Sequence, residues 1–175
     1  ESVESKKSFH NAFSDFLSYS MTELSGKNDD YVKLYGYEAG KFYFPNMLSH
    51  LREFTEEESL SPMGNDLLGE FYEDKVSHIR QSPFESFPVA LAQNKILEKG
   101  IDNDSDLIVI SCCGSGRTLL AISREAERPL QYCGIDANPL FVKITAVNLL
   151  LNGLMGEVIC TDGNGYRGHF RHGYK

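Results

Sequence analysis

The chain has 175 residues, 41% of them hydrophobic and 24% charged, and a formal net charge of −8, a composition ordinary for a globular protein. This length suits one domain with a helical appendage. No apolar run reaches the roughly 18–20 residues that span a bilayer, and the first residues lack the basic-then-apolar order of a signal peptide. We therefore expect a cytoplasmic protein without a membrane partner.

The acidic excess lies mainly in residues 1–100, which argues against unaided binding of nucleic acid, because phosphate contacts need a basic surface. Arg167, Arg171 and Lys175 make the end of the chain basic, and we interpret this tail as a solvated end. The chain starts without Met and stops soon after its third predicted strand, which leaves open that it is a fragment.

Two helices are predicted in the first sixty residues. Apolar side chains recur at helical spacing over residues 5–24: Phe9, Phe13, Phe16, Leu17 and Leu24. Residues 31–44 are rich in aromatic side chains, which we interpret as core packing rather than a base-stacking surface. A second helix is predicted after Pro45, with these side chains inward: Met47, Leu48, Leu51 and Phe54.

A loop over residues 56–65 is predicted to divide the chain into an N-terminal helical segment, 1–60, and an α/β domain with leading helices, 61–175. Asp66 is expected to cap a helix that runs to about Val76 and buries Leu67, Leu68, Phe71 and Tyr72. Residues 82–88 contain two prolines and are predicted as a connector, and a further helix is expected to end at Gly100. We expect residues 66–99 to pack against the sheet.

Strands and helices alternate in the remainder of the chain. Strands are predicted at 107–111, 131–135 and 157–161, with helices at 117–126 and 139–152. This alternation predicts an α/β fold with a doubly wound parallel sheet, in the order 3-2-1 with the first strand innermost, because crossovers are right-handed.

A nucleotide-cofactor site is predicted where the first strand meets its helix. The loop Cys113-Gly114-Ser115-Gly116 lets backbone N–H groups approach a ligand, and Asp136 follows at the end of the second strand, where it can accept hydrogen bonds from ribose hydroxyls. This chemistry suits NAD and S-adenosylmethionine equally. A dinucleotide fingerprint has a small residue where this chain has Leu119, which argues against NAD. Asp162, after the third strand, is either a further ligand contact or a loop residue.

The cysteines and histidines predict no metal site. Four cysteines lie in or beside predicted strands at spacings that fit neither a zinc ribbon nor a disulfide framework, so we interpret them as small buried hydrophobic residues: Cys112, Cys113, Cys133 and Cys160. His169 and His172 lie near the end of the chain and are interpreted as solvated.

Four stretches carry a family resemblance through their order and spacing: DLLGEFYE at 66–73, CGSG at 113–116, GIDANP at 134–139 and NLLLNG at 148–153. Together they resemble the N-6 adenine DNA methylases, the modification subunits of type I-like restriction-modification systems, and above all the short methylase-like proteins of bacterial mobile elements.

The resemblance implies a Rossmann-like methyltransferase core that binds S-adenosylmethionine. Gly114 and Gly116 would then face the methionine end of the cofactor, Asp136 the ribose and Asp162 the adenine. The implied cofactor-binding set is completed by Phe84, in the segment that packs over the cofactor in the family, and by Cys113, Ser115 and Ala137.

Three departures from the family pattern bear on activity. Ile110 and Ser111 stand where the family has Asp-Pro, and an apolar residue cannot hold the ammonium group of the cofactor, so weak or lost affinity is expected. Glu85-Ser86 replaces Thr-Pro after Phe84. The Asn-Pro-Pro-Tyr motif that grips the adenine amino group in the family does not occur, so catalytic residues are unknown and no DNA methylation is expected from this chain alone.

Three hypotheses for function stay open. The first is a degenerate or partial DNA methylase that reaches DNA through a partner subunit. The second is a methyltransferase with a non-DNA acceptor. The third is a non-catalytic interaction module whose acidic helical region binds a protein partner. Ile110 and Glu85 favour the first and third hypotheses over the second.

Overall fold

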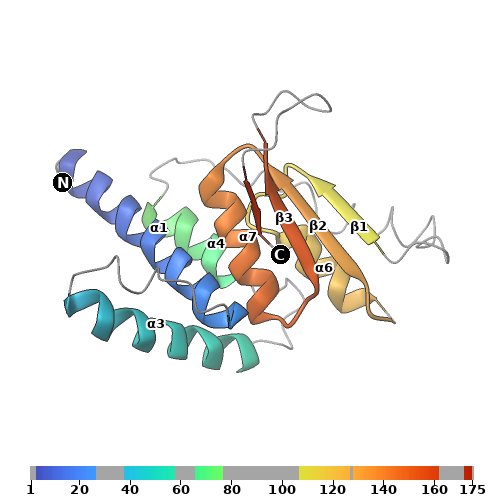
Figure 1. The fold of residues 1–175 in the computed structure, drawn as a ribbon, viewed down its shortest axis with the longest axis horizontal. Helices are drawn as coiled ribbons and strands as arrows, with labels where there is room; N and C mark the ends of the chain where they lie inside the picture. The colour runs from blue at the N-terminus through green and yellow to red at the C-terminus, as the bar shows by residue number, and fades with distance from the viewer. Residues whose placement is uncertain are drawn as a thin grey trace.

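The structure is a computed structural model that describes residues 3–26, 38–57, 66–76, 107–126, 128–161 and 172–174. These residues form an α/β structure in which a small, mainly parallel sheet is joined to a group of helices (Figure 1). None of the helices in these ranges is long and apolar enough to cross a membrane. Predictions for Phe84, Asp162 and residues 77–106 lie outside the described residues.

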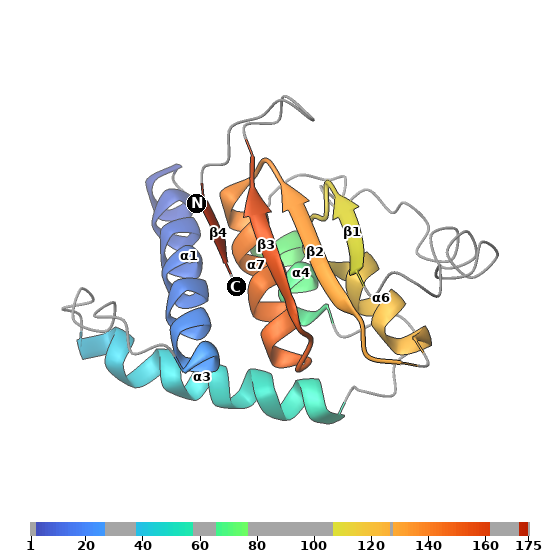
Figure 2. The ribbon, with the colours of Figure 1, turned by 45° about the vertical axis from the view of Figure 1, so that its right-hand side comes forward.

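Three parallel strands form the sheet in the order predicted. β1 (Leu107–Ser111), β2 (Gln131–Asp136) and β3 (Gly156–Cys160) pair side by side (Figure 2). In this register Ile110 pairs with Gly134, and Gly134 pairs with Val158. One expectation was wrong, because β1 forms one end of the described sheet instead of an inner position. A strand that was not predicted, β4 (His172–Tyr174), pairs antiparallel with β3.

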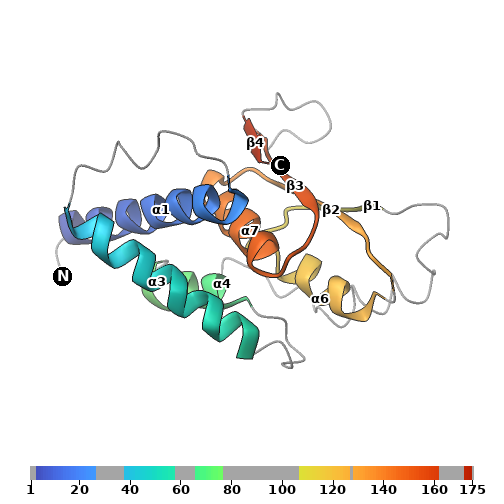
Figure 3. The same ribbon diagram turned by 60° about the horizontal axis from the view of Figure 1, so that its bottom comes forward.

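The crossover helices α6 (Arg117–Glu125) and α7 (Pro139–Leu151) lie on the same side of the sheet (Figure 3). Local sequence sets the ends of α7: the Asn138 side chain accepts a hydrogen bond from the Leu140 N–H at 3.0 Å, and Pro139 occupies the first helical position. Gly153, with φ 64°, ends the helix, since the Leu154 N–H turns back to the Leu149 carbonyl at 2.9 Å. Both helices confirm the predicted ranges to within one residue.

The helix-facing side of the sheet carries one hydrophobic core. Alternate residues of the strands point toward α6 and α7, as the two-residue period of a strand requires. The buried members of this cluster are Cys113, Leu119, Ile122, Leu130, Tyr132, Val142, Ala146, Leu149, Val158 and Cys160.

A second hydrophobic core joins the N-terminal helices to α7. α1 (Val3–Ser25), predicted correctly, runs beside α7 (Figure 3). The α4 helix (Leu67–Phe71) and the π-helical turn η2 (Tyr72–Val76) complete this group. The buried residues of this core are Phe13, Phe16, Leu17, Leu48, Leu68, Tyr72, Val76, Leu140, Ile144 and Val147.

Helix α3 (Glu38–Glu57) begins before Pro45 rather than after it, and two of its side chains predicted inward are exposed. Leu48 is buried against α1, whereas Met47 and Phe54 are 43% and 55% exposed. In α4, Leu68 is buried as expected, but Phe71 is 36% exposed and contacts the Phe13 ring from the outside of the core.

Candidate functional site

The loop between β1 and α6 follows a left-handed backbone path. Cys112, Gly114 and Gly116 have φ values of 54°, 59° and 85°. Glycine adopts such angles readily, whereas a residue with a Cβ is strained there. Cys112 is therefore the strained position of this loop.

Gly116 is also required by close packing against α7. A Cβ at this position would lie 2.9 Å from the Thr145 methyl carbon, closer than side-chain carbons normally approach. The Gly116 N–H closes the turn by donating to the Cys113 carbonyl at 2.9 Å. Gly116 is the N-cap of α6 and supplies no side-chain hydrogen bond to the first turn of that helix.

The two parts of the predicted cofactor site lie together at the carboxyl ends of the parallel strands. Asp136, half-buried at the end of β2, accepts a hydrogen bond from the Gly114 N–H at 2.9 Å through Oδ2 and one from the Asn138 N–H at 2.8 Å through Oδ1. A carboxylate oxygen has two lone pairs, so each oxygen of Asp136 retains the capacity to accept another hydrogen bond.

Helix α7 holds the other side of the loop. The Thr145 hydroxyl donates to the Gly114 carbonyl at 2.8 Å, and the Asn148 side-chain amide donates to the Ser115 carbonyl at 2.9 Å. Thr145 and Asn148 are both buried polar residues in an otherwise apolar stretch of helix. Their hydrogen bonds explain why polar side chains are stable at these positions.

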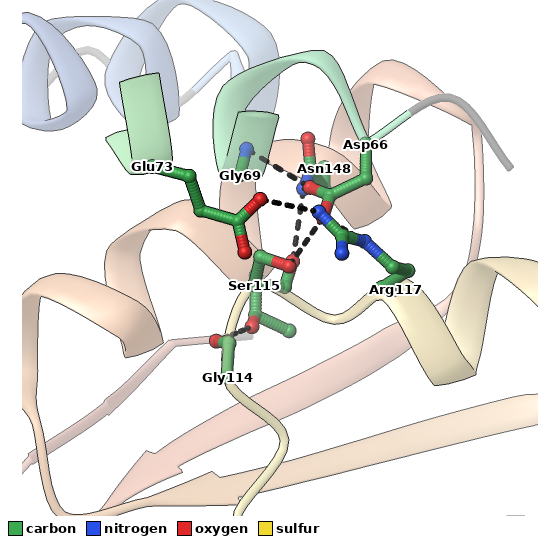
Figure 4. Close-up of polar contacts among 8 residues, drawn as sticks. Asp66, Gly69, Glu73, Gly114, Ser115, Arg117 and Asn148 are labelled. Carbon is green, nitrogen blue, oxygen red and sulfur yellow. Dashed lines mark hydrogen bonds and ion pairs between the residues drawn. The ribbon is translucent and has the colours of Figure 1, made fainter. Parts of the chain in front are cut away.

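Asp66 connects α4 to the same loop (Figure 4). Its Oδ1 accepts hydrogen bonds from the Gly69 N–H at 3.0 Å and from the Asn148 amide at 2.8 Å. Its Oδ2 accepts hydrogen bonds from the Ser115 hydroxyl and, at 2.8 Å, from the Arg117 Nε. We call Asp66, Ser115, Arg117 and Asn148 the Asp66 cluster.

Three members of the Asp66 cluster, Asp66, Ser115 and Asn148, are buried, and the partly exposed Arg117 side chain offsets the charge of the Asp66 carboxylate. Asp66 is 2% exposed, and burial raises the pKa of its carboxyl group, while the Ser115 hydroxyl and the Arg117 charge act in the opposite direction. Arg117 also contacts Glu73 at 3.4 Å, so its guanidinium group faces two carboxylates. These two acidic neighbours raise the pKa of Arg117 despite its burial.

The sequence indicated Asp66 as a helix cap, and Asp66 and Asn148 as the first residues of two motif stretches, but it assigned no site role to Arg117, Thr145 or Asn148. The contacts of Asp66 with Ser115 in the loop and with Asn148 in α7 join residues 49 and 82 positions apart, which local sequence pattern does not reveal. One signal was present: polar Thr145 and Asn148 interrupt an apolar helix, and buried polar side chains need partners.

The cysteines are free thiols with contrasting environments. Cys113, Cys133 and Cys160 are buried, which confirms their interpretation as small core residues, but Cys112 is exposed, contrary to it. The Cys113 thiol lies 3.5 Å from the Thr145 hydroxyl oxygen, and burial raises its pKa to about 12. Because a thiolate is the reactive form, Cys113 is suited to packing and not to nucleophilic chemistry.

The remaining predicted site residues differ in their exposure. Ala137 is exposed immediately after Asp136, and Ser115 is 1% exposed within the Asp66 cluster. Ile110 packs against the sheet core, so its apolar side chain has an apolar environment. Within the described ranges, no group of three His, Cys, Asp or Glu side chains is arranged to hold a metal ion.

Comparison with protein-family models, with curated proteins and with solved structures gives no match to this chain.

Proposed function

We propose that this protein binds S-adenosylmethionine in a Rossmann-like methyltransferase core and is related to the N-6 adenine DNA methylases. The contact between the Asp136 carboxylate and the Gly114 N–H carries the proposal, because it brings the glycine loop and the acid of the second strand to one point. Ligands of open α/β sheets bind at this edge, outside the carboxyl ends of the strands.

The residues present fit the ribose part of this cofactor. Both oxygens of Asp136 can accept a further hydrogen bond, which is what vicinal ribose hydroxyls require. The first turn of α6 supports an anionic group such as the cofactor carboxylate, since Gly116 leaves the N-terminal backbone N–H groups without a side-chain cap. When bound, the cofactor supplies a methyl group on a sulfonium centre.

The residues present fit the ammonium group of the cofactor poorly. Ile110 stands at the family's Asp position and packs into the sheet core. Affinity is therefore expected to be weak. With no Asn-Pro-Pro-Tyr motif in the sequence, we propose a degenerate or partial methylase that does not modify DNA alone and contacts DNA through a partner subunit.

Calorimetric titration of the full chain with S-adenosylmethionine, S-adenosylhomocysteine and NAD tests the proposal. We expect the first two ligands to bind and NAD not to bind, because Leu119 replaces the small residue of a dinucleotide fingerprint. Tight binding of NAD alone would contradict the family relationship.

The position of the ribose is tested by pairing a protein variant with an altered ligand. Asp136→Asn should weaken S-adenosylhomocysteine binding by about 1.5–3 kcal/mol, the range for hydrogen bonds to a charged group. An analogue without the 2′- and 3′-hydroxyls should bind the wild-type protein more weakly than S-adenosylhomocysteine by a similar free energy. The variant should bind this analogue and S-adenosylhomocysteine with nearly equal affinity. Asp74→Asn, at an exposed acid, is the matched control. Independent, additive losses would place the ribose elsewhere.

A second candidate, the non-catalytic interaction module, is favoured by one observation. Tyr43, Met47 and Phe54 on α3 are 61%, 43% and 55% exposed, which is unusual for large apolar side chains on one helix. A folded protein that binds none of the three ligands in the titration would support this candidate over the cofactor-binding function.

A further inference from the structure

The Asp66 carboxylate has more partners than a helix cap needs. Capping α4 requires one hydrogen bond, which the Gly69 N–H supplies, and α4 has only five residues. The other three donors come from Ser115 in the glycine loop, Arg117 at the start of α6 and Asn148 in α7. The carboxylate therefore joins three segments that are far apart in the sequence.

The hydrogen bonds of the cluster fix the orientation of the loop. The Ser115 hydroxyl is held by Asp66, and its carbonyl is held by Asn148, which is itself held by Asp66. Thr145 holds the preceding carbonyl, that of Gly114. Across a trans peptide the N–H and C=O point in opposite directions, so the Ser115 N–H points away from Thr145.

We infer that Asp66 is a positioning residue for the glycine loop and sets cofactor affinity through Ser115 and Asn148 without touching the cofactor. This inference rests on the proposed function, because affinity is one of its two consequences. The other consequence, a fixed loop, is independent of any ligand. A loop held in its binding conformation loses less entropy when a ligand binds.

Asp66→Asn is a specific test, because it keeps the shape of the side chain and replaces one acceptor oxygen with an NH₂ donor. All four partners of Asp66 are donors, two to each oxygen. An amide NH₂ in place of either oxygen would face donors in both of its orientations. Asp74→Asn is the matched control, since Asp74 belongs to the same described segment and is exposed.

Alkylation of the cysteines measures the loop without a ligand. Cys113 lies in the loop and is 7% exposed, Cys112 is exposed, and Cys133 and Cys160 are buried in the sheet. In Asp66→Asn we expect iodoacetamide to label Cys113 faster, while Cys133 and Cys160 stay protected, as read by peptide mass spectrometry. Labelling of Cys113 at the rate seen in wild type and Asp74→Asn would overturn the inference.

Affinity is measured in parallel. If the wild-type protein binds S-adenosylhomocysteine, Asp66→Asn should weaken binding about tenfold, comparable to one lost hydrogen bond to a charged group. Unchanged affinity overturns the inference and leaves the proposed function standing. Absence of binding by the wild type contradicts the proposed function, and faster Cys113 labelling in Asp66→Asn would still support the positioning role.

Ser115→Ala covers the case in which Asp66→Asn unfolds the protein and exposes the three buried thiols. It removes one donor and leaves three hydrogen bonds on the Asp66 carboxylate. We expect a smaller increase in Cys113 labelling than in Asp66→Asn, and none in Ser123→Ala, whose hydroxyl bonds within α6. Equal labelling of Cys113 in the two serine variants would overturn the inference.

Discussion

Cys113, in the glycine loop, and Asp66, beside it, are both buried, but the Cys113 thiol is a neutral packing group whereas the Asp66 carboxylate accepts hydrogen bonds from four donors. Burial raises the pKa of the Cys113 thiol and the nearby Asp136 charge adds to this effect, while the hydrogen bond with the Thr145 hydroxyl acts in the opposite direction. The free energy of unfolding therefore depends on pH in the alkaline range, because the Cys113 thiol stays protonated in the folded state and ionises in the unfolded state.

Stability should fall above pH 9 in part through Cys113. Its pKa is raised from 9.0 to about 12 in the folded protein, so the unfolded chain releases a proton that the folded chain keeps. Between these values the folded state loses up to about 1.4 kcal/mol of stability per pH unit from this group. In urea unfolding between pH 8 and 11, Cys113→Ala should show a shallower decline than wild type.

Comparison of wild type with Cys113→Ala separates the contribution of the Cys113 thiol to the pH dependence from that of the other titrating side chains. Burial also raises the pKa of Tyr72 and Tyr132, and it lowers that of Lys143, which acts in the opposite direction as pH rises. The control is Cys112→Ala, the same substitution at the exposed neighbour, which should keep the wild-type decline. An identical pH slope in the two variants would contradict the assignment.

At the scale of the elements, much of the α/β part was predictable from the sequence. The apolar runs and their spacing predicted β1, β2, α6 and α7 to within one residue. Pro45 misled because it was interpreted as a helix start and lies inside α3. β4 has three residues, too few for a period-two pattern to be detected.

Burial on α3 was the least predictable feature because periodicity identifies an apolar face but not how much of it finds a partner. Leu48 meets α1, while Met47 and Phe54, on the same predicted face, stay exposed. In α1, most of the expected face is buried. Phe13, Phe16 and Leu17 lie in the core shared with α7 and Leu24 is partly buried beside it, whereas Phe9 is 43% exposed.

Leu17→Ala should therefore cost about 2–5 kcal/mol of unfolding free energy, the range for leucine truncation in a packed core. Leu17 is 0% exposed and belongs to the cluster with Ile144 and Val147. Leu107→Ala is the matched control, since this leucine is 47% exposed and its truncation should cost less than about 1 kcal/mol. Equal losses in urea unfolding would show that α1 does not dock on α7 as described.

At the scale of the whole molecule, the N-terminal helices and the sheet share α7. One side of this helix packs on α1 through Leu140, Ile144 and Val147, and the Lys143 amino group donates to the Ser14 and Ser18 hydroxyls at 2.9 and 2.8 Å. The division of the chain at residue 60 stays a prediction. The shared core indicates how removal of residues 1–60 would affect the stability of the remaining chain.

A chain that starts at Ser61 should be less stable and less soluble than the full chain. Removing α1 would expose Leu140, Ile144 and Val147, each worth about 1.5–3 kcal/mol when buried. Their sum is comparable to the total stability of a typical domain. Cooperative thermal unfolding and the soluble fraction are the measurements.

Adding a peptide of residues 3–26 to the truncated chain provides the control, because it restores α1 without the covalent connection. We expect the peptide to raise the unfolding temperature of the truncated chain. A truncated chain that is soluble and unfolds as cooperatively as the full chain would instead support the boundary at residue 60.

The shared helix α7 has a thermodynamic consequence. Thr145 and Asn148 hold the glycine loop from the same helix whose Ile144 and Val147 hold α1. Two events that stabilise one element are linked, and linkage is reciprocal. Ligand binding at the glycine loop would therefore strengthen the packing of α1 on α7. Conversely, weaker packing of α1 on α7 would lower the affinity of the loop for its ligand.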